Sequence, residues 1–307
     1  MTFKLVHALA GMVLSLSLVA PAAADSFDDA VAAFDRGDYA AALQLFRPLA
    51  EQGRASVQYN LGLMYEHGLG ANQDYAEAAK WYRRAADQGA VDAQTNLAAL
   101  YASGRGLPKN DAEAVRWYRR AAEQGAAPAQ FELGLRYERG PGVKQDYAEA
   151  ARWYRLAAEQ GDTEARISLA GLYFNGQGVT QDYAEAARWY RLAADQGAAT
   201  AQLNLGNLYE YGLSMPKDDV QAARWYRLAA DQGSGLAQLN LGLFYHDGAG
   251  GLPKDPVRAY MWISLAATSG EPDASHWRDL IGRTMSSQEL AEAQALIRDW
   301  KPAKPPA

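Results

Sequence analysis

Tryptophan recurs in this chain at a fixed interval, and this interval limits what the chain can fold into. Five tryptophans lie 36 residues apart and a sixth follows after 37, at Trp81, Trp117, Trp153, Trp189, Trp225 and Trp262. A period of roughly 20–50 residues is typical of proteins built from one supersecondary unit stacked on itself. The sequence therefore predicts one continuous solenoid over its 307 residues rather than one or two globular domains.

Each period contains two segments whose apolar residues have the spacing of an amphipathic helix. In the first period, Val57, Leu61 and Tyr65 lie four residues apart on one face of a first helix, and Trp81 and Tyr82 lie on a second helix. A hairpin of two such helices cannot bury its apolar face without a neighbour, so the hairpins are expected to stack with the tryptophans in the core. Six repeats are predicted, at residues 54–89, 90–125, 126–161, 162–197, 198–233 and 234–270.

Glycines mark the ends of the helices and one contact between them. Gly68 follows the first helix and is predicted to adopt the left-handed conformation that closes a helix. Gly62, inside the same helix, is predicted to let two helix axes approach closely. Gly-x-Gly pairs such as Gly104 and Gly106 follow helices rather than strands, which favours helix termination over a phosphate-binding loop.

Polar side chains predict the start of the second helix and its exposed end. Asp74 precedes this helix and Glu77 follows three residues later, a spacing close to that of a capping box, in which the two side chains each accept the other residue's backbone N–H. Each such cap is expected to contribute about 1 kcal/mol. Arg83 and Arg84 are expected to point into solvent near the helix end, where positive charge suits the helix dipole.

Residues 1–24 predict a signal peptide for export. Lys4 supplies a positive start, residues 5–20 are largely apolar, and Ala22 to Ala24 fit a cleavage site, so removal is expected after Ala24. The alternative is an uncleaved membrane anchor, but the apolar run is short of the roughly 20 residues that a spanning helix needs. No later stretch is long and apolar enough to span a bilayer, so the mature chain is expected to be periplasmic or secreted.

The two ends of the array are predicted to carry capping elements. Residues 25–53 are expected to form an N-terminal hairpin, in which the pattern Phe-x-x-Gly-Asp-Tyr at 34–39 resembles a tetratricopeptide unit. Residues 271–301 are expected to form C-terminal capping helices, the last with a serine N-cap. Solenoids need such caps because an end repeat has one face without a neighbour. Residues 302–307 hold three prolines and are predicted to be a disordered tail.

Two motifs recur through the six repeats. They are Ala-x-x-x-Leu-Gly-x-x-Tyr-x-x-Gly in the first helix and Asp-Tyr-x-x-Ala-x-x-Trp-Tyr-x-x-Ala-Ala-x-x-Gly in the second. Residues 54–270 thereby resemble Sel1-like repeats, relatives of tetratricopeptide repeats with about 36 residues each. The resemblance implies an all-α fold, a right-handed superhelix of αα-hairpins that binds other proteins. Exported bacterial members look like adaptors or regulators of envelope signalling and cell-surface processes. One branch, with a disulfide in each repeat, has been linked to β-lactam binding, and this chain, which has no cysteine, departs from it.

No catalytic residue, metal ligand or cofactor site is predicted. The histidines of the mature chain, His67, His246 and His276, are spread over the array, and at roughly 10 Å per stacked hairpin they are not expected to share a site. Ser214 and Lys217 match the Ser-x-x-Lys motif of penicillin-recognising enzymes, but its companion motifs are absent. An envelope enzyme, or a β-lactam-binding or peptidoglycan-binding protein, is therefore kept as the alternative function.

The candidate binding residues are polar side chains repeated on the first helices. One equivalent position carries Asn60, Asn96, Glu132, Ser168, Asn204 and Asn240, and a position beside it carries Gln58, Gln94, Gln130, Gln202 and Gln238. The corresponding position of tetratricopeptide arrays looks inward, and an amide there offers a donor and an acceptor to an extended peptide backbone. This predicts a partner-binding ladder on the concave face. The alternative is that the amides bond to the neighbouring hairpin and hold the stack. Both interpretations stay open at this point.

The charge pattern narrows the class of partner. The formal net charge is −6, and each repeat mixes arginine with aspartate and glutamate, which does not favour nucleic acid. We expect a monomeric or weakly associating scaffold, without cofactor or metal, that binds a protein or peptide partner as an adaptor or regulator of envelope processes or signalling.

Overall fold

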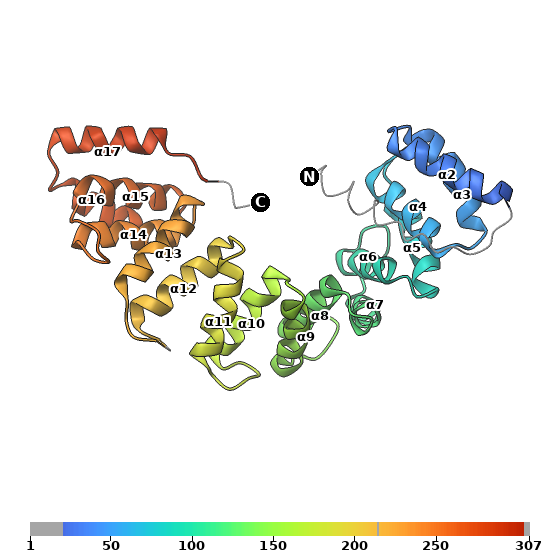
Figure 1. The fold of residues 1–307 in the computed structure, drawn as a ribbon, viewed down its shortest axis with the longest axis horizontal. Coiled ribbons are helices and arrows are strands. Elements are labelled where there is room, and N and C mark those ends of the chain that lie inside the picture. The colour runs from blue at the N-terminus through green and yellow to red at the C-terminus, as the bar shows by residue number, and fades with distance from the viewer. Residues whose placement is uncertain (1–20, 214, 304–307) are drawn as a thin grey trace. The chain divides into compact units, whose positions relative to one another are not determined.

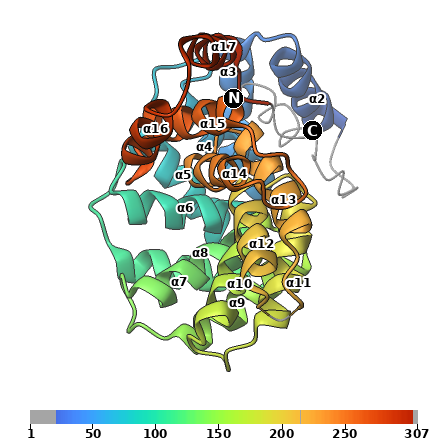
Figure 2. The same cartoon turned by 90° about the vertical axis from the view of Figure 1, so that its left-hand side faces the viewer.

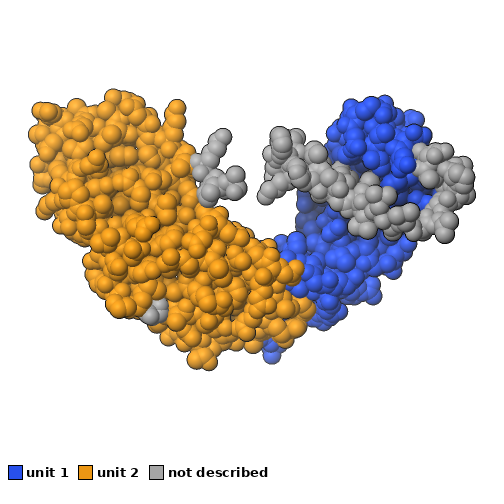
Figure 3. Space-filling view, in the orientation of Figure 1, with its two compact units in different colours: residues 1–146 blue, residues 147–307 orange. Residues whose placement is uncertain are grey.

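The computed structural model describes residues 21–213 and 215–303. The chain divides into two compact units, residues 1–146 and residues 147–307, which have different colours in Figure 3. All regular secondary structure in the described residues is helical, as Figures 1 and 2 show. The predicted all-α architecture of αα-hairpins is therefore confirmed.

Unit 1 begins with the N-terminal hairpin and continues through the first repeats. Its described helices are α2 (Pro21–Asp35), α3 (Tyr39–Glu51), α4 (Ala55–His67), α5 (Tyr75–Asp87), α6 (Val91–Ser103), α7 (Asp111–Glu123) and α8 (Ala127–Arg139). From α2 to α8, each helix packs on the next one of the unit, both within a hairpin and between hairpins. Neighbours in sequence are thus neighbours in space, as the solenoid prediction requires.

Unit 2 continues the same pattern and adds the C-terminal cap. Its described helices are α9 (Tyr147–Glu159), α10 (Thr163–Asn175), α11 (Tyr183–Ala194), α12 (Ala199–Tyr211), α13 (Asp219–Asp231), α14 (Gly235–Asp247), α15 (Pro256–Thr268), α16 (Ala274–Gly282) and α17 (Ser287–Asp299). Both α16 and α17 pack against α15, the second helix of the last repeat. The side chain of Ser286 and that of Glu289 form the capping box that starts α17, which confirms the predicted serine cap.

The predicted signal peptide falls mostly outside the described residues. Residues 1–20 are not described, and α2 begins at Pro21, before the predicted cleavage after Ala24. Export therefore stays a prediction. Among the helices of residues 21–213 and 215–303, none combines the length and the apolarity that a membrane crossing requires.

The tryptophans lie in the core, as predicted from their period. Trp117 is fully buried, Trp81 is 7% exposed and Trp262 is 3% exposed, whereas Trp225 is half-buried. The alanines beside them are also buried, so the packing between helices is close. A small residue is needed where Gly62 faces a tyrosine, because a Cβ there would lie 2.6 Å from the ring of Tyr82.

Side chains of aspartate or asparagine cap the starts of α5, α7, α11, α13 and α15. At α5 the cap is not the reciprocal pair that the sequence predicts. The Asp74 carboxylate accepts the N–H groups of Ala76 at 2.9 Å and Glu77 at 3.0 Å. The N–H of Asp74 donates instead to the carbonyl of Tyr65 at 2.9 Å, which ties the loop to the first helix. Glu77 therefore has no capping role and pairs with Lys80 at 2.5 Å. The prediction of a capping box is therefore wrong at α5, whereas the predicted N-cap at Asp74 is confirmed.

One of the two arginines predicted to be solvated is an inter-repeat contact. Arg84 is exposed and lies over the ring of Trp81. Arg83 is half-buried, donates to the Tyr101 hydroxyl of the next hairpin, and lies 5.3 Å from the ring centroid of Trp117. The same arginine–tyrosine bond recurs along each unit, at Arg47–Tyr65, Arg119–Tyr137, Arg155–Tyr173, Arg191–Tyr209 and Arg227–Tyr245.

Part of the predicted disordered tail is packed against the fold. After α17 ends, the Trp300 ring meets the Trp262 ring edge-on at 6.4 Å between centroids. The N–H of Ala303 then donates to the carbonyl of Asp231, the last residue of α13, at 2.7 Å. The Ala303 N–H thereby supplies a donor to a helix C-terminal carbonyl that has no partner within its helix. Residues 304–307 lie outside the described residues.

Candidate partner-binding surface

The first helices of each unit present a stripe of half-exposed side chains. Four positions of each helix form it, and we call this stripe the first-helix surface. In unit 1 it comprises Tyr59, Asn60, Leu63, Glu66, Thr95, Asn96, Ala99, Ala102, Phe131, Glu132, Leu135 and Glu138. In unit 2 it comprises Ile167, Ser168, Gly171, Phe174, Leu203, Asn204, Asn207, Glu210, Leu239, Asn240, Leu243 and His246. All are half-exposed except Asn60 and Leu63, which are buried.

The predicted glutamines are not on this surface. Each is at most 4% exposed, and its side-chain N–H donates to a carbonyl near the end of the preceding second helix. These bonds are Gln58–Ala50, Gln94–Ala86, Gln130–Ala122, Gln202–Ala194 and Gln238–Ala230, at 2.9 to 3.3 Å. In the fourth repeat Arg166 takes the same place and donates to the carbonyl of Ala158 at 3.1 Å. The glutamines therefore join consecutive hairpins.

A second set of amides completes the network. Gln88, at the end of α5, donates to the side-chain oxygen of Gln58 at 2.7 Å, and Gln124 donates in the same way to Gln94 at 2.8 Å. In unit 2, Gln232 donates to Gln202 at 2.8 Å. A buried amide whose donor and acceptor are both bonded inside the fold has nothing left to offer a partner. The structural role is therefore assigned to Gln58, Gln94 and Gln202. Gln130 and Gln238 share their burial and their bond to the preceding hairpin, and the buried side-chain oxygen of Gln238 has no hydrogen-bond partner.

Replacing Gln94 with leucine is expected to lower the free energy of unfolding by about 2 kcal/mol. The carbonyl of Ala86 would lose its side-chain donor and the amide of Gln124 would lose its acceptor. Equilibrium unfolding in urea measures the loss. Thr95→Leu is the matched control, because the Thr95 hydroxyl bonds only to the carbonyl of Val91 in its own helix. Similar losses in both variants would contradict the assigned role.

The asparagines have a different environment from the glutamines. Asn96, Asn204 and Asn240 are half-exposed, whereas Asn60 is 6% exposed. Burial raises the pKa of the Tyr82 hydroxyl well above its usual range. The Asn96 side chain lies within hydrogen-bonding reach of this hydroxyl and has the opposite, smaller effect on its pKa. Asn96 is thus half-exposed, with one side close to the buried Tyr82 and part of its amide accessible to solvent.

Buried tyrosines support carboxylates at the edge of the surface. The Tyr82 hydroxyl donates to Glu66 at 2.5 Å, and the Tyr226 hydroxyl donates to Glu210 at 2.5 Å and lies 2.7 Å from the side-chain oxygen of Asn207. Burial, followed by the bond to Glu210 and its charge, raises the pKa of Tyr226, so this phenol stays a donor at physiological pH. The carboxylates of Glu66 and Glu210 are thereby held by tyrosines that are fully buried.

The charge and the apolar content of the surface limit what it can bind. Its four positions carry the carboxylates Glu66, Glu132, Glu138 and Glu210 and no lysine or arginine. Glu132, at the ladder position of α8, lies 4.0 Å from Arg136, which also pairs with Asp111 at 3.0 Å. In most first helices, an apolar or aromatic side chain directly precedes the position that carries Asn60, Asn96 and their equivalents. The surface therefore suits an extended segment with apolar and basic side chains.

The histidines of the described residues do not gather into one site. His67 lies in unit 1, whereas His246 and His276 belong to α14 and α16 of unit 2. His246 lies 2.8 Å from the carboxylate of Asp247 and meets the ring of Trp277 edge-on. Among residues 21–213 and 215–303, no group of three or more histidine, aspartate or glutamate side chains could hold a metal ion. Ser214 is not described, so the Ser-x-x-Lys motif is not tested.

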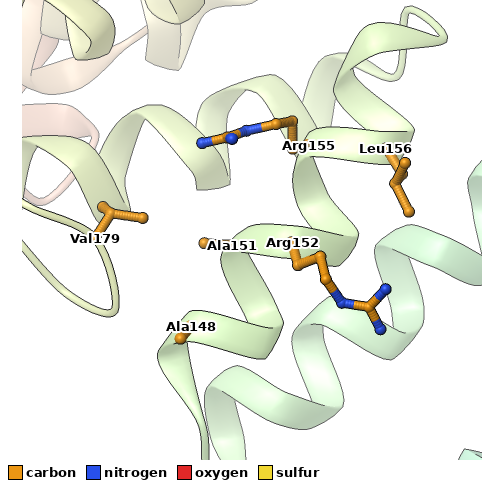
Figure 4. A pocket seen from close by; sticks show the side chains of 6 residues that line it. All are labelled: Ala148, Ala151, Arg152, Arg155, Leu156 and Val179. Carbon is orange, nitrogen blue, oxygen red and sulfur yellow. The ribbon is translucent and has the colours of Figure 1, made fainter.

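A cavity of about 310 Å³ in unit 2 lies against the second helix α9, and none of its lining residues belongs to the first-helix surface. Its lining side chains come from α9 and from the loop before α11, as Figure 4 shows, and are Ala148, Ala151, Arg152, Arg155, Leu156 and Val179. Arg152 is already paired with Glu149 at 3.0 Å, and Arg155 donates to Tyr173. This cavity contains no acid, base or nucleophile free for chemistry.

The stacked αα-hairpins and the amides that join them define a helical-repeat solenoid. Seven segments of the chain match the Sel1 repeat family, at residues 35–53, 55–89, 91–125, 127–162, 163–197, 199–234 and 235–271. They cover more than half of the chain, which therefore belongs to the Sel1 repeat family. Six of them correspond to the predicted repeats. The first covers α3, so the predicted N-terminal cap contains part of a Sel1 repeat.

Several solved structures are similar to this chain, and two of them are about one third identical to it. A Sel1 repeat protein from Oxalobacter formigenes is 34% identical, with a TM-score of 0.67 over 79% of this chain and 96% of that one. The protein c5321, a protective antigen present in uropathogenic Escherichia coli strains that displays an SLR fold, is 33% identical, with a TM-score of 0.55 over 90% of this chain and 68% of that one. None of the curated proteins compared with this chain matches it significantly.

Proposed function

We propose that this chain is a non-enzymatic scaffold whose first-helix surface binds an extended segment of a partner protein. The observation that carries the proposal is the recurrence of a half-exposed polar side chain beside a half-exposed apolar one on successive first helices. Leu203 with Asn204, and Leu239 with Asn240, are examples in unit 2. An asparagine amide can donate to and accept from a peptide backbone, while the apolar neighbour contacts a side chain.

The partner segment is expected to carry basic as well as apolar residues. Carboxylates occur on the surface without a lysine or arginine among its four positions, so an acidic segment would be repelled and a basic one attracted. The contribution of each rim charge is expected to be modest and to fall as salt is added. Selectivity between partners would therefore come from the apolar contacts and the amides together.

We further propose that the protein is exported as a monomer and serves as an adaptor or regulator of envelope processes or signalling. Support comes from the N-terminal sequence, with its positive start, apolar run and small residues before Asp25. Cell fractionation followed by N-terminal sequencing tests this directly. A mature chain beginning at Asp25 in the periplasm or medium is expected, and a cytoplasmic chain retaining Met1 would contradict it.

Partner capture tests the binding surface. The triple variant Asn96/Asn204/Asn240→Ala is expected to recover at least about tenfold less partner from envelope extract than the wild type, since each lost main-chain contact weakens binding by about 1 kcal/mol. Asn60 is left intact because it is buried. In-cell crosslinking before extraction, followed by mass spectrometry, identifies the partner.

A matched triple variant on the second helices is the control for this capture experiment. Asp87, Glu123 and Glu159 are exposed at the ends of α5, α7 and α9, and their replacement by alanine is expected to leave recovery unchanged. Circular dichroism confirms that both variants are folded. If the folded asparagine variant recovered as much partner as the wild type, or if both variants lost equal amounts, the proposed role of the first-helix surface would be contradicted.

A further inference from the structure

A half-exposed carboxylate of unit 1 lies between groups from three consecutive helices. Glu66 of α4 accepts from the hydroxyl of Tyr82 on α5 at 2.5 Å, and Asn96 of α6 lies within hydrogen-bonding reach of that hydroxyl. The half-exposed ring of Tyr59 lies 5.8 Å from the Tyr82 ring between centroids. Burial raises the pKa of Tyr59 to about 12, and the negative charges of Asp92 and Glu66 add to this rise. The surface is therefore electronegative here and offers hydrogen-bond acceptors beside an aromatic ring.

Unit 2 contains the same cluster at equivalent positions of its repeats. Glu210 of α12 accepts from the hydroxyl of Tyr226 on α13 at 2.5 Å, and Asn240 of α14 lies within hydrogen-bonding reach of that hydroxyl. Leu203 occupies the position of Tyr59 in this repeat. We call the two clusters the tyrosine–glutamate sites, and their members are Glu66, Tyr82 and Asn96 in unit 1 and Glu210, Tyr226 and Asn240 in unit 2.

A third repeat shows which group fits beside such a tyrosine. Tyr118 of α7 occupies the same position of its repeat as the tyrosines of the two sites. The guanidinium of Arg136 lies 5.8 Å from the centroid of the Tyr118 ring and within hydrogen-bonding reach of its hydroxyl. The same guanidinium lies 3.0 Å from the carboxylate of Asp111 and 4.0 Å from that of Glu132, which occupies the asparagine position. A phenol, carboxylates and a guanidinium are thus combined beside the first-helix surface.

The two tyrosine–glutamate sites share the phenol and the carboxylate with this repeat but differ in the guanidinium. The position of Arg136 is occupied by Leu100 in unit 1 and by Phe244 in unit 2, and both side chains are buried. Among residues 21–213 and 215–303, no lysine, arginine or histidine forms an ion pair with Glu66 or Glu210. An opposite charge within about 4–6 Å favours the ionised carboxylate, so a guanidinium supplied by another molecule would stabilise each site.

We propose that each tyrosine–glutamate site binds the guanidinium group of an arginine in the partner segment that the first-helix surface holds. The carboxylate and the asparagine oxygen accept its N–H groups, and the neighbouring Tyr59 or Leu203 contacts its methylene groups. Arginine suits the sites better than lysine because its planar group donates several N–H groups in a fixed geometry and stacks on aromatic rings. This inference rests on the proposed function, and it specifies which side chain of the partner binds and where.

Fluorescence anisotropy with synthetic peptides tests the arginine sites. The probes are short labelled peptides in which leucine alternates with arginine, with lysine or with citrulline, the neutral analogue of arginine. The arginine peptide is expected to bind the full chain at least about tenfold more tightly than the citrulline peptide, since hydrogen bonds to a charged group are the stronger ones. It is expected to bind severalfold more tightly than the lysine peptide, which has the same charge but lacks the planar group.

Two pairs of substitutions separate the sites from the general negative charge of the chain. Glu66→Gln combined with Glu210→Gln is expected to bring the affinities of the arginine and citrulline peptides close together. Glu123→Gln combined with Glu159→Gln is the matched control, because it removes the same charge from exposed positions at the ends of α7 and α9. This control is expected to keep the preference for arginine over citrulline. Circular dichroism confirms that both variants are folded.

The tyrosines are tested as positioning residues. Tyr82→Phe combined with Tyr226→Phe keeps the buried rings and removes the hydroxyls that hold the two carboxylates. The variant is expected to lose most of the preference for arginine over lysine, because a carboxylate that is free to turn no longer matches the planar group. A folded variant with the wild-type preference would contradict this role of the hydroxyls.

The remaining outcomes separate the arginine sites from the proposed function. Equal affinities of the arginine and citrulline peptides for the wild type, no binding of either, or the same loss of preference in both glutamine variants would overturn the arginine sites. Partner capture with Asn204→Ala tests the first-helix surface apart from them, because Asn204 belongs to this surface and to neither site. Reduced recovery with Asn204→Ala alongside equal peptide affinities would overturn the arginine sites alone.

Discussion

Replacing Gly106 with alanine is expected to lower the free energy of unfolding by about 3 kcal/mol or more. Gly106 has a φ of 70°, and a Cβ there would lie 2.2 Å from the carbonyl carbon of Tyr75, at the start of the preceding second helix. That atom belongs to the backbone of α5 and cannot rotate away, so the hairpins would have to separate. Equilibrium unfolding in guanidinium, followed by circular dichroism, measures the loss.

Gly89→Ala is the control that separates the close approach from backbone strain. Gly89 also has a positive φ, of 93°, but no neighbouring atom lies within 4 Å of the position that its Cβ would take. Its replacement is expected to cost only the strain of a left-handed alanine, about 1–2 kcal/mol. Equal losses at Gly89 and Gly106 would show that the contact with Tyr75 is not the cause.

Trp117→Ala is expected to cost about 3–5 kcal/mol, the range for removing a large buried aromatic side chain. The indole is fully buried, and Arg83 from the preceding hairpin lies against it at 5.3 Å. Because each hairpin of a solenoid is stabilised mainly by its neighbours, the loss is expected to uncouple the array and split its unfolding into two transitions. Thermal unfolding followed by calorimetry detects the second transition.

Trp225→Ala is the comparison for Trp117→Ala, because the two tryptophans occupy equivalent positions of different repeats. Trp225 is half-buried, so its removal is expected to cost less than that of Trp117 and to leave a single transition. A single, unshifted melt for Trp117→Ala, or a larger effect at Trp225, would contradict the packing described above.

The repeat unit could be predicted well from the sequence because the same pattern of residues recurs in six units. The interval between tryptophans, the four-residue spacing of Val57, Leu61 and Tyr65, and the glycines after each helix are local patterns that need no knowledge of tertiary contacts. The structure has the helices, the buried indoles and the left-handed Gly68 that these patterns indicate. The N-cap at Asp74 was equally local and equally predictable.

The candidate site was less predictable, because recurrence marks the core as strongly as it marks a binding surface. Gln94 and Asn96 recur with the same period and have similar side chains, and they lie on the same helix. The structure separates them, because the carbonyl of Ala86 in the preceding hairpin lies where it can accept from Gln94 and not where a partner could reach. The role of Asn96 in binding stays a prediction.

By itself, the sequence determined that this protein is an all-α array of stacked hairpins, since period and helical spacing depend only on positions along the chain. The tertiary structure decided which polar groups each hairpin uses on its neighbour. The Asp74 N–H donates to the carbonyl of Tyr65, and Arg83 donates to the Tyr101 hydroxyl. Gly106, which has no side chain, allows the close approach of the backbone of α5. Each of these contacts joins groups from different helices, and their distances follow from how the helices pack, which spacing in the sequence does not specify.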